Sequence, residues 1–158
     1  MMCHERTADS NVAIRRQAGF SFVELAVTLA ITGILAAVAA PRIPVMLASY
    51  DVAEAARQVA LDLRLARGRA ITSNGHARLQ FDGHTYTPQR ESTPGSGTYV
   101  SDGALQNLAS SVTVTTDPSA PTFDSRGLTT QTYTVTLTSS YGPTKTITVT
   151  TIGRINAN

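Results

Sequence analysis

Apolar residues fill the chain from Phe20 to Ala40, and Glu24 is the one charged residue among them. A helix over this run would extend about 30 Å, which matches the hydrocarbon thickness of a bilayer. An ionised carboxylate in lipid costs about 2.5–3.5 kcal/mol, so Glu24 requires either a positive partner or contact with water at the membrane surface. Neither Lys nor Arg occurs within the run. The pattern therefore predicts a membrane-spanning helix whose carboxylate is paired from outside the segment or lies at the interface.

A second helical pattern follows the apolar run. Pro41 and Pro44 each remove a backbone donor, so we expect a kink near the membrane surface. Apolar residues then recur at intervals of three or four, the period of a helix with one buried face. The stripe consists of Val52, Ala56, Val59, Leu63, Ala66 and Ala70. Asn74-Gly75 is a helix stop signal, and the two stretches together predict one helix of about 50 residues.

From residue 75 onward the apolar period changes to two, which is typical of strands. Alternation on both sides of Asp82-Gly83 predicts a hairpin with a type I′ turn. Residues 88–98 are rich in Pro, Gly, Ser and Thr and predict a mobile loop. Short strands are expected at residues 99–100 and 112–114.

The strongest strand pattern lies in the C-terminal third. Apolar residues there alternate with threonines on both sides of a turn at Tyr141-Gly142-Pro143. The apolar set is Tyr133, Val135, Leu137, Ile147 and Val149. We expect these two strands to pair as a hairpin, with the apolar side chains on the helix and the threonines toward water.

The order of the elements predicts an α+β fold: a long N-terminal transmembrane helix packed on a C-terminal antiparallel β domain. Its predicted parts are a membrane helix at 20–40, an amphipathic half of the same helix at 41–74, and the β domain at 75–158. Residues 1–19 form a short leader before the membrane helix.

Composition narrows the classes of function. The 158 residues carry a net charge of +2, which is far from the charge of a general polyanion-binding protein. The one cysteine, Cys3, lies in the leader, so neither disulfides nor a thiolate nucleophile are expected in the rest of the chain. The sequence has no Gly-x-Ser-x-Gly motif and no Gly-rich phosphate-binding loop, and we expect neither enzyme activity nor a cofactor. His76, Asp82 and His84 flank the first hairpin, but this pattern more often forms a solvated loop than a metal site, so no metal is expected.

Basic residues beside the apolar run predict its orientation. Arg15 and Arg16 precede the run and Arg42 follows it, so the side before the run has more basic residues than the side after it. Because basic residues are retained in the cytoplasm, we expect a cytoplasmic N-terminus and a domain outside the cytoplasmic membrane.

A conventional signal peptide is the competing interpretation. Ala37-Val38-Ala39 fits a small-x-small cleavage site, and a cut there would release a soluble protein that begins at Ala40. The length of the apolar run and the presence of Glu24 argue against it.

A cut between Gly19 and Phe20 would create the positive partner that Glu24 lacks. The new α-amino group of Phe20 could meet Glu24 of the same helix or of a neighbouring copy, and the second contact would fix the stagger between packed helices. Gly19, Phe20 and Glu24, followed by the apolar run, resemble the class III signal of type IV prepilins and type II secretion pseudopilins. The resemblance implies that a prepilin peptidase cuts after Gly19 on the cytoplasmic side, that Phe20 is N-methylated, and that Glu24 neutralises the amine of an adjacent subunit during assembly.

Two further segments flank the threonine-rich hairpin: Phe123-Asp124-Ser125-Arg126-Gly127 before it and Gly153-Arg154-Ile155 after it. Their order resembles the GspH/FimT family of minor pilins and pseudopilins. This resemblance implies a structural subunit of a type II secretion pseudopilus or a type IV pilus. Such a subunit is anchored in the bacterial inner membrane, and its partners are other pilins and, on its outer domain, secreted cargo or DNA.

DNA uptake is the alternative function. Some pilins of this family are thought to contact DNA through a C-terminal Gly-Arg-x-Arg motif, to which Gly153 and Arg154 correspond here, while Asn156 replaces the second arginine. Phosphate contact needs several cations on one face. Arg154, Arg126 and Lys145 are the candidates, and they could cluster around the end of the last hairpin.

Overall fold

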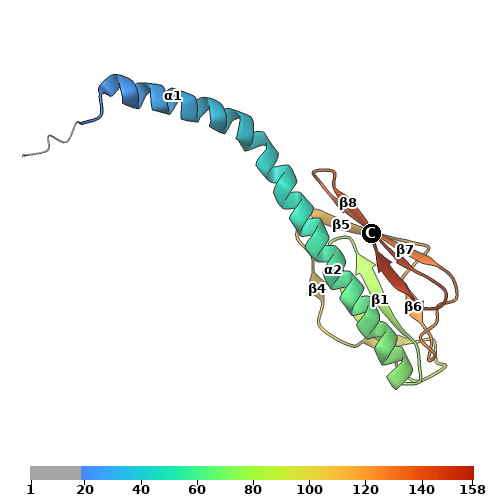
Figure 1. Ribbon diagram of the computed structural model, residues 1–158. Helices are drawn as coiled ribbons and strands as arrows, with labels where there is room; N and C mark the ends of the chain where they lie inside the picture. The colour runs from blue at the N-terminus through green and yellow to red at the C-terminus, as the bar shows by residue number, and fades with distance from the viewer. Residues whose placement is uncertain (1–18) are drawn as a thin grey trace, which may run out of the picture. The chain divides into compact units, whose positions relative to one another are not determined.

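The computed structural model describes residues 19–158. Most of the leader, with Cys3, Arg15 and Arg16, lies outside the described residues. Three helical segments follow one another: α1 (Phe22–Ala39), a short 3-10 segment η1 (Ala40–Arg42) and α2 (Ile43–Thr72) (Figure 1). The chain divides into two units, the first ending at Ala39 and the second comprising Ala40–Asn158.

The helix changes its hydrogen-bond pattern near Pro41 and Pro44, where the sequence predicts a kink. Pro41 lies within η1, and Pro44 lies in the first turn of α2, where a missing N–H leaves no helical bond unmade. α2 ends where the sequence predicts it. Asn74 adopts a left-handed conformation with φ of 50°, and the backbone N–H of Gly75 donates to the carbonyl oxygen of Ala70 at 3.2 Å.

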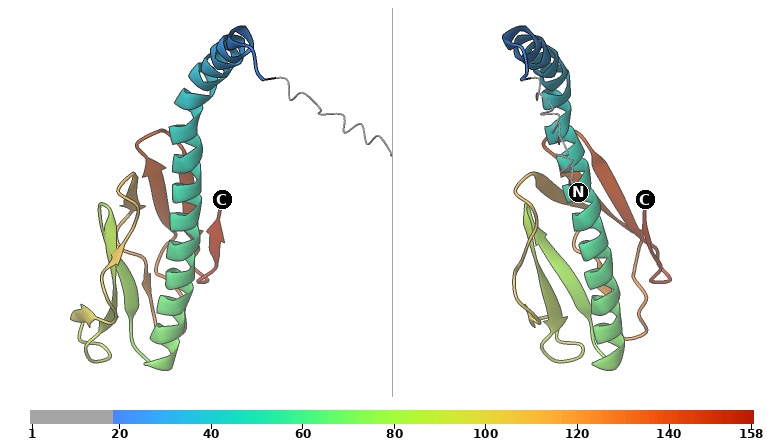
Figure 2. Two further views of the ribbon diagram at one scale, coloured as in Figure 1. Left: turned by 90° about the vertical axis from the view of Figure 1, so that its left-hand side faces the viewer. Right: turned by 60° about the vertical axis from the view of Figure 1, so that its left-hand side comes forward.

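Two antiparallel sheets pack on α2. The first has the order β3-β2-β1-β6 with β4 beside β2, and the second has the order β5-β7-β8-β9. The strands of the first sheet are β1 (Ala77–Asp82), β2 (Thr85–Glu91), β3 (Tyr99–Ser101), β4 (Gln106–Asn107) and β6 (Thr122–Phe123). Those of the second are β5 (Val112–Asp117), β7 (Tyr133–Ser139), β8 (Thr144–Val149) and β9 (Ile155–Ala157). Figure 2 shows α2 running along both sheets.

The core lies between α2 and the sheets, and it contains every residue of the predicted helical stripe. Tyr86 and Phe123 are its largest fully buried side chains. The hydroxyl of Tyr86 donates to Oδ2 of Asp62 on α2, so this polar group reaches a partner at the margin of the core. Burial and this hydrogen bond raise the pKa of Tyr86 above its ordinary value. The α+β fold class is confirmed.

The threonine-rich hairpin forms as predicted. Val135 of β7 pairs with Ile147 of β8, and both side chains are fully buried. The threonines between the buried positions of β7 and β8 are half-buried or exposed on the other face of the sheet. The alternation and the turn between the two strands therefore predicted both the pairing and the face that meets α2.

Two predictions about the first hairpin are wrong in detail. Gly83 has φ of 58°, but its neighbour His84 does not have positive φ. This pattern belongs to a type II′ turn rather than to type I′. In addition, β2 extends to Glu91, so only residues 92–98 form the loop that was expected to begin at residue 88. Pro88 is accommodated in the strand opposite Leu79, and its carbonyl oxygen accepts a hydrogen bond from the N–H of Asp102 at 2.8 Å.

Candidate assembly and binding sites

Glu24 lies in the first turn of α1, close to the helix N-terminus. The helix carries no buried residue, and no residue in 19–158 forms an ion pair with Glu24. The helix dipole favours a carboxylate in this first turn. Gly19 and Phe20 precede the helix, and the Phe20 side chain is 83% exposed. Within the described chain, the predicted cleavage site and the carboxylate are thus both accessible.

The other polar side chains of α1, Thr28 and Thr32, form hydrogen bonds inside the helix. Thr28 donates its hydroxyl to the carbonyl oxygen of Leu25 at 2.9 Å, and Thr32 donates to that of Thr28 at 2.7 Å. Such bonds let hydroxyl groups lie in an apolar environment. Among the described helices, the one that begins at Phe22 is long and apolar enough to cross a membrane. Glu24 is therefore the one polar side chain of α1 that lipid would leave without a partner.

Two glycines meet beside α2. Gly127 and Gly153 have φ of 74° and 73°, a region that L side chains rarely adopt. A Cβ on Gly153 would lie 2.0 Å from the carbonyl oxygen of Gly127. Nε of Arg67 donates to this same oxygen at 2.9 Å. The glycines allow two turns and the helix to approach closely, and Arg67 ties the three segments together.

Arg154 lies beside α2 rather than beside the other candidate cations. It lines a hollow of about 490 Å³, together with Arg64 and Arg67 of the helix. Its Nε donates to Oδ1 of Asn156 at 3.2 Å. Neither Arg64 nor Arg154 forms an ion pair with any residue in the described part of the chain.

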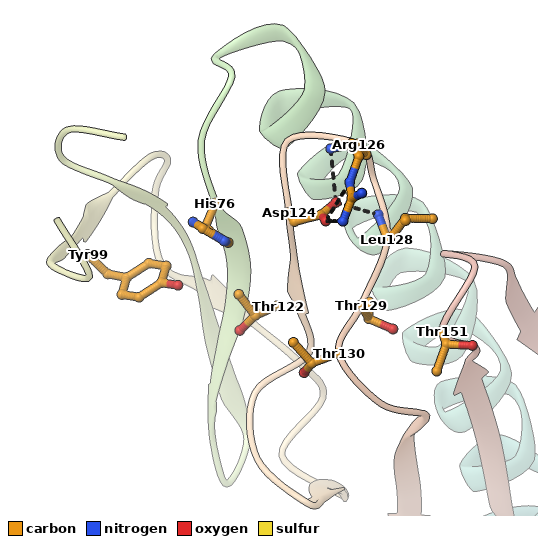
Figure 3. A pocket seen from close by; sticks show the side chains of 9 residues that line it. All are labelled: His76, Tyr99, Thr122, Asp124, Arg126, Leu128, Thr129, Thr130 and Thr151. Atoms are coloured by element: carbon orange, nitrogen blue, oxygen red, sulfur yellow. Dashed lines mark hydrogen bonds and ion pairs between the residues drawn. The ribbon is translucent and has the colours of Figure 1, made fainter. Parts of the chain in front are cut away.

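Arg126 lines a different hollow, of about 550 Å³, shown in Figure 3. Its guanidinium contacts Oδ2 of Asp124 at 3.1 Å, and the backbone N–H groups of Arg126 and Leu128 donate to Oδ1 at 2.9 and 2.8 Å. Burial alone would raise the pKa of Asp124, but these hydrogen bonds outweigh it and lower the pKa. The charge of Arg126 is thus compensated by a carboxylate within its own turn.

Lys145 lines a third hollow, of about 280 Å³, with Arg57. The expected cluster of Arg154, Arg126 and Lys145 does not form. Lys145 lies near the start of β8, whereas Arg154 follows the end of that strand, and Arg126 belongs to the turn after β6. Arg154 instead shares its hollow with Arg64 and Arg67 of α2, which were not among the predicted cations.

Glu91 is a buried carboxylate at the end of β2. It accepts hydrogen bonds from Nδ1 of His76 at 2.7 Å and from the backbone N–H of Gly97 at 2.7 Å. The contact with His76, followed by that with Gly97, outweighs burial and lowers the pKa of Glu91 to about 2. Glu91 therefore fastens the 92–98 loop to the residue that precedes β1.

The two histidines flanking the first hairpin have separate partners. His76 contacts Glu91, while Nδ1 of His84 donates to the carbonyl oxygen of Val112 at 2.6 Å. Asp82 lies at the opposite end of β1 from His76. In residues 19–158, no group of three or more His, Cys, Asp or Glu side chains is placed to hold a metal ion.

Comparisons with protein families match two parts of the chain. The model described as "Type II transport protein GspH" matches residues 55–153, and the model described as "Prokaryotic N-terminal methylation motif" matches residues 14–40. The first match includes α2 from residue 55 onward and every strand except β9. The second includes Gly19, Phe20 and Glu24. No curated protein sequence matches the chain.

Solved structures of pilins and pseudopilins share the fold. The solution structure of Escherichia coli GspH is 16% identical, with a TM-score of 0.60 over 70% of this chain and 89% of that chain. The minor pseudopilin EpsH of the Vibrio cholerae type 2 secretion system is 14% identical, with a TM-score of 0.57 over 68% and 96%. The type IV minor pilin FimU of Pseudomonas aeruginosa is 16% identical, with a TM-score of 0.57 over 69% and 89%.

Proposed function

This chain belongs to the GspH family of minor pilins and pseudopilins, and from that membership we propose that it is a non-enzymatic subunit that supports assembly of a type II secretion pseudopilus or a type IV pilus. The observation that carries the proposal is the exposed apolar surface of α1. This helix has no buried residue and one carboxylate, whereas the core of the protein consists of residues from α2 and the sheets. An apolar helix of this kind contacts lipid while the subunit is in the membrane, and it packs against the helices of other subunits in the filament.

Glu24 determines the register in which α1 packs against the helices of neighbouring subunits. Cleavage by a prepilin peptidase between Gly19 and Phe20 generates a positive amine, which is then N-methylated. The amine of one subunit meets Glu24 of its neighbour, and the pair offsets the cost of placing each charge in an apolar environment. Because an unpaired charge is expensive there, helices in any other register are disfavoured.

The subunit is inserted once in the bacterial inner membrane. The leader lies in the cytoplasm, and the domain from Pro41 onward lies in the periplasm. Arg15 and Arg16 before the apolar run outweigh Arg42 after it, and they support this orientation. In a filament the outer domain presents its surface to other pilins and to secreted cargo.

Replacing Glu24 with Gln tests the assembly role, because the substitution removes the charge while keeping the size of the side chain. Breaking a buried ion pair costs about 3–5 kcal/mol, so incorporation into sheared filaments should decrease by well over tenfold. Leader removal and the amount of protein in the membrane should not change. Glu54→Gln, the same change on the exposed surface of α2, is the matched control. Wild-type incorporation of Glu24→Gln would refute the role.

DNA contact is a second candidate function, and the hollow that Arg154 shares with Arg64 and Arg67 favours it. If Arg154 neutralises a phosphate, Arg154→Ala should weaken duplex binding by the full chain in detergent and reduce the salt slope of log K by about 1. Arg126→Ala should have a smaller effect because Asp124 compensates its charge. Equal binding by wild type and Arg154→Ala at low salt would remove this candidate.

A further inference from the structure

The outer edge of β9 has backbone groups without hydrogen-bond partners. Antiparallel pairing alternates: the carbonyl oxygen of Arg154 accepts from the N–H of Thr150, directly after β8, and the N–H of Asn158 donates to the carbonyl oxygen of Thr146 in β8. Ile155 and Ala157 occupy the other positions, opposite Val149 and Ile147, so their N–H and C=O groups point away from β8. β9 is the last strand in its sheet, and no residue in 19–158 hydrogen-bonds to these groups. Two donors and two acceptors are therefore available for another strand.

A groove between β9 and α2 leaves room beside this edge. The hollow of about 490 Å³ lies beside Ile155, and the hollow of about 280 Å³ lies beside Ala157. On the helix side the residues that line the two hollows are Ala53, Ala56, Arg57, Arg64, Arg67, Gly68 and Ile71. We name this pair of hollows the α2–β9 groove. Figure 2 shows β9, next to the C label, to one side of α2.

The groove is positive and has apolar margins. Its cations are Arg57, Arg64, Arg67, Lys145 and Arg154. Glu54, 3.8 Å from Arg57, is the one carboxylate within ion-pair distance of any of these side chains among the described residues. Ile152, at the turn before β9, is 65% exposed and lines the same groove. The surface therefore complements a segment that carries negative charge and some apolar contact area.

We propose that the free edge of β9 and the α2–β9 groove dock an extended, acidic segment of a partner protein, which adds a strand to the second sheet. A polypeptide is favoured over a nucleic acid because its own N–H and C=O groups complement those of Ile155 and Ala157. The proposal goes beyond filament assembly, since it concerns a partner of the outer domain and does not involve Glu24. Its failure would leave the assembly role untouched.

A defined peptide tests the recognition. The probe is a fluorescein-labelled decapeptide of alternating Glu and Thr, added to the full chain in detergent and followed by anisotropy. A decapeptide of alternating Lys and Thr is the matched control. The acidic peptide should bind and the basic one should not. Arg64→Glu should weaken binding of the acidic peptide by roughly tenfold, whereas Arg126→Glu, in a different hollow, should not. Equal binding of both peptides would overturn the proposal.

Backbone substitution separates strand addition from simple charge attraction. Ala157→Pro removes an outward N–H that β8 does not use, a position where an edge strand tolerates proline. Binding of the acidic peptide should weaken roughly three- to tenfold, while Ala157→Val keeps the N–H and should bind like wild type. The thermal midpoint of each variant reports whether the fold is retained. An unchanged affinity in folded Ala157→Pro would overturn the proposal.

Amide exchange of the wild-type protein gives a measurement that does not depend on variants. The N–H groups of Ile155 and Ala157 should exchange quickly in the free protein and become protected when the acidic peptide binds. Binding without this protection would overturn the proposal. If the bound peptide leaves both amides unprotected and a 20-base-pair DNA duplex displaces it, the arginines would be assigned to phosphate and the proposal would be overturned.

Discussion

At the scale of single residues, Gly153 is the glycine at which an added side chain would meet the closest contact, the carbonyl oxygen of Gly127. A methyl group on Gly153 would lie 2.0 Å from a backbone oxygen, which no side-chain rotation can relieve. We expect Gly153→Ala to lower the free energy of unfolding by roughly 2–4 kcal/mol, because left-handed strain and overpacking add. Gly83→Ala, also at positive φ but with no atom within 4 Å of the added carbon, should cost only about 1–2 kcal/mol. Denaturant unfolding of the full chain in detergent measures both, and equal losses would contradict the contact.

The hydrogen bond from Tyr86 to Asp62 is a second prediction at this scale. Tyr86 is fully buried, and its hydroxyl donates to a carboxylate, so Tyr86→Phe removes a charge-assisted bond without creating a cavity. The expected loss is about 1–3 kcal/mol of unfolding free energy. Tyr141→Phe is the control, because Tyr141 is exposed and should change stability by less than about 0.5 kcal/mol. If the two variants are equally stable, the Tyr86 hydroxyl contributes nothing to folding.

At the scale of elements, Glu91 makes the attachment of the 92–98 loop dependent on pH. Its pKa is lowered from 4.5 to about 2, so ionised Glu91 stabilises the folded state above about pH 4.5 and loses this effect as the pH falls toward 2. Glu91→Gln should therefore be less stable than wild type at about pH 6, and the difference should shrink at about pH 2.5. Denaturant unfolding at the two pH values checks this. Glu54→Gln should show little difference at either pH, because Glu54 is exposed.

The elements differ in how far the sequence predicts them. The helical stripe and the threonine hairpin follow from periodicity, because burial of one face imposes a fixed spacing on neighbouring residues. The extent of β2 does not follow from periodicity, because it depends on whether the strand tolerates Pro88. The position of Pro88 between β1 and the 99–107 segment requires no backbone N–H, so the strand continues through it. The turn type was also not predicted correctly. Asp-Gly indicates where the chain turns, but it does not determine which of the two central residues has positive φ.

Contacts between residues that are far apart in the sequence are even harder to predict from it. Arg67 and Gly127 are 60 residues apart, and nothing in their local sequence announces a hydrogen bond between them. Arg154 was expected to cluster with Arg126 and Lys145 around the end of the last hairpin, yet the cations that line its hollow, Arg64 and Arg67, belong to α2. Glu91 carries no motif at all. Contacts between distant segments depend on tertiary packing, which periodicity does not encode.

At the scale of the whole molecule, the chain separates two tasks. The outer domain buries its core with residues of α2 and the sheets, while α1 keeps an apolar surface with a single carboxylate. The core forms among residues of α2 and the sheets, whereas the surface of α1 remains available to lipid or to other subunits. In the proposed function, cleavage before Phe20 at the start of this helix would supply the positive charge that Glu24 lacks.

The intact mass of the protein purified from membranes, combined with N-terminal sequencing, tests this most directly. The account predicts a chain that lacks residues 1–19, begins at Phe20 and carries one added methyl group on its α-amine. A chain that retains its leader, or one that begins at Ala40, would contradict it.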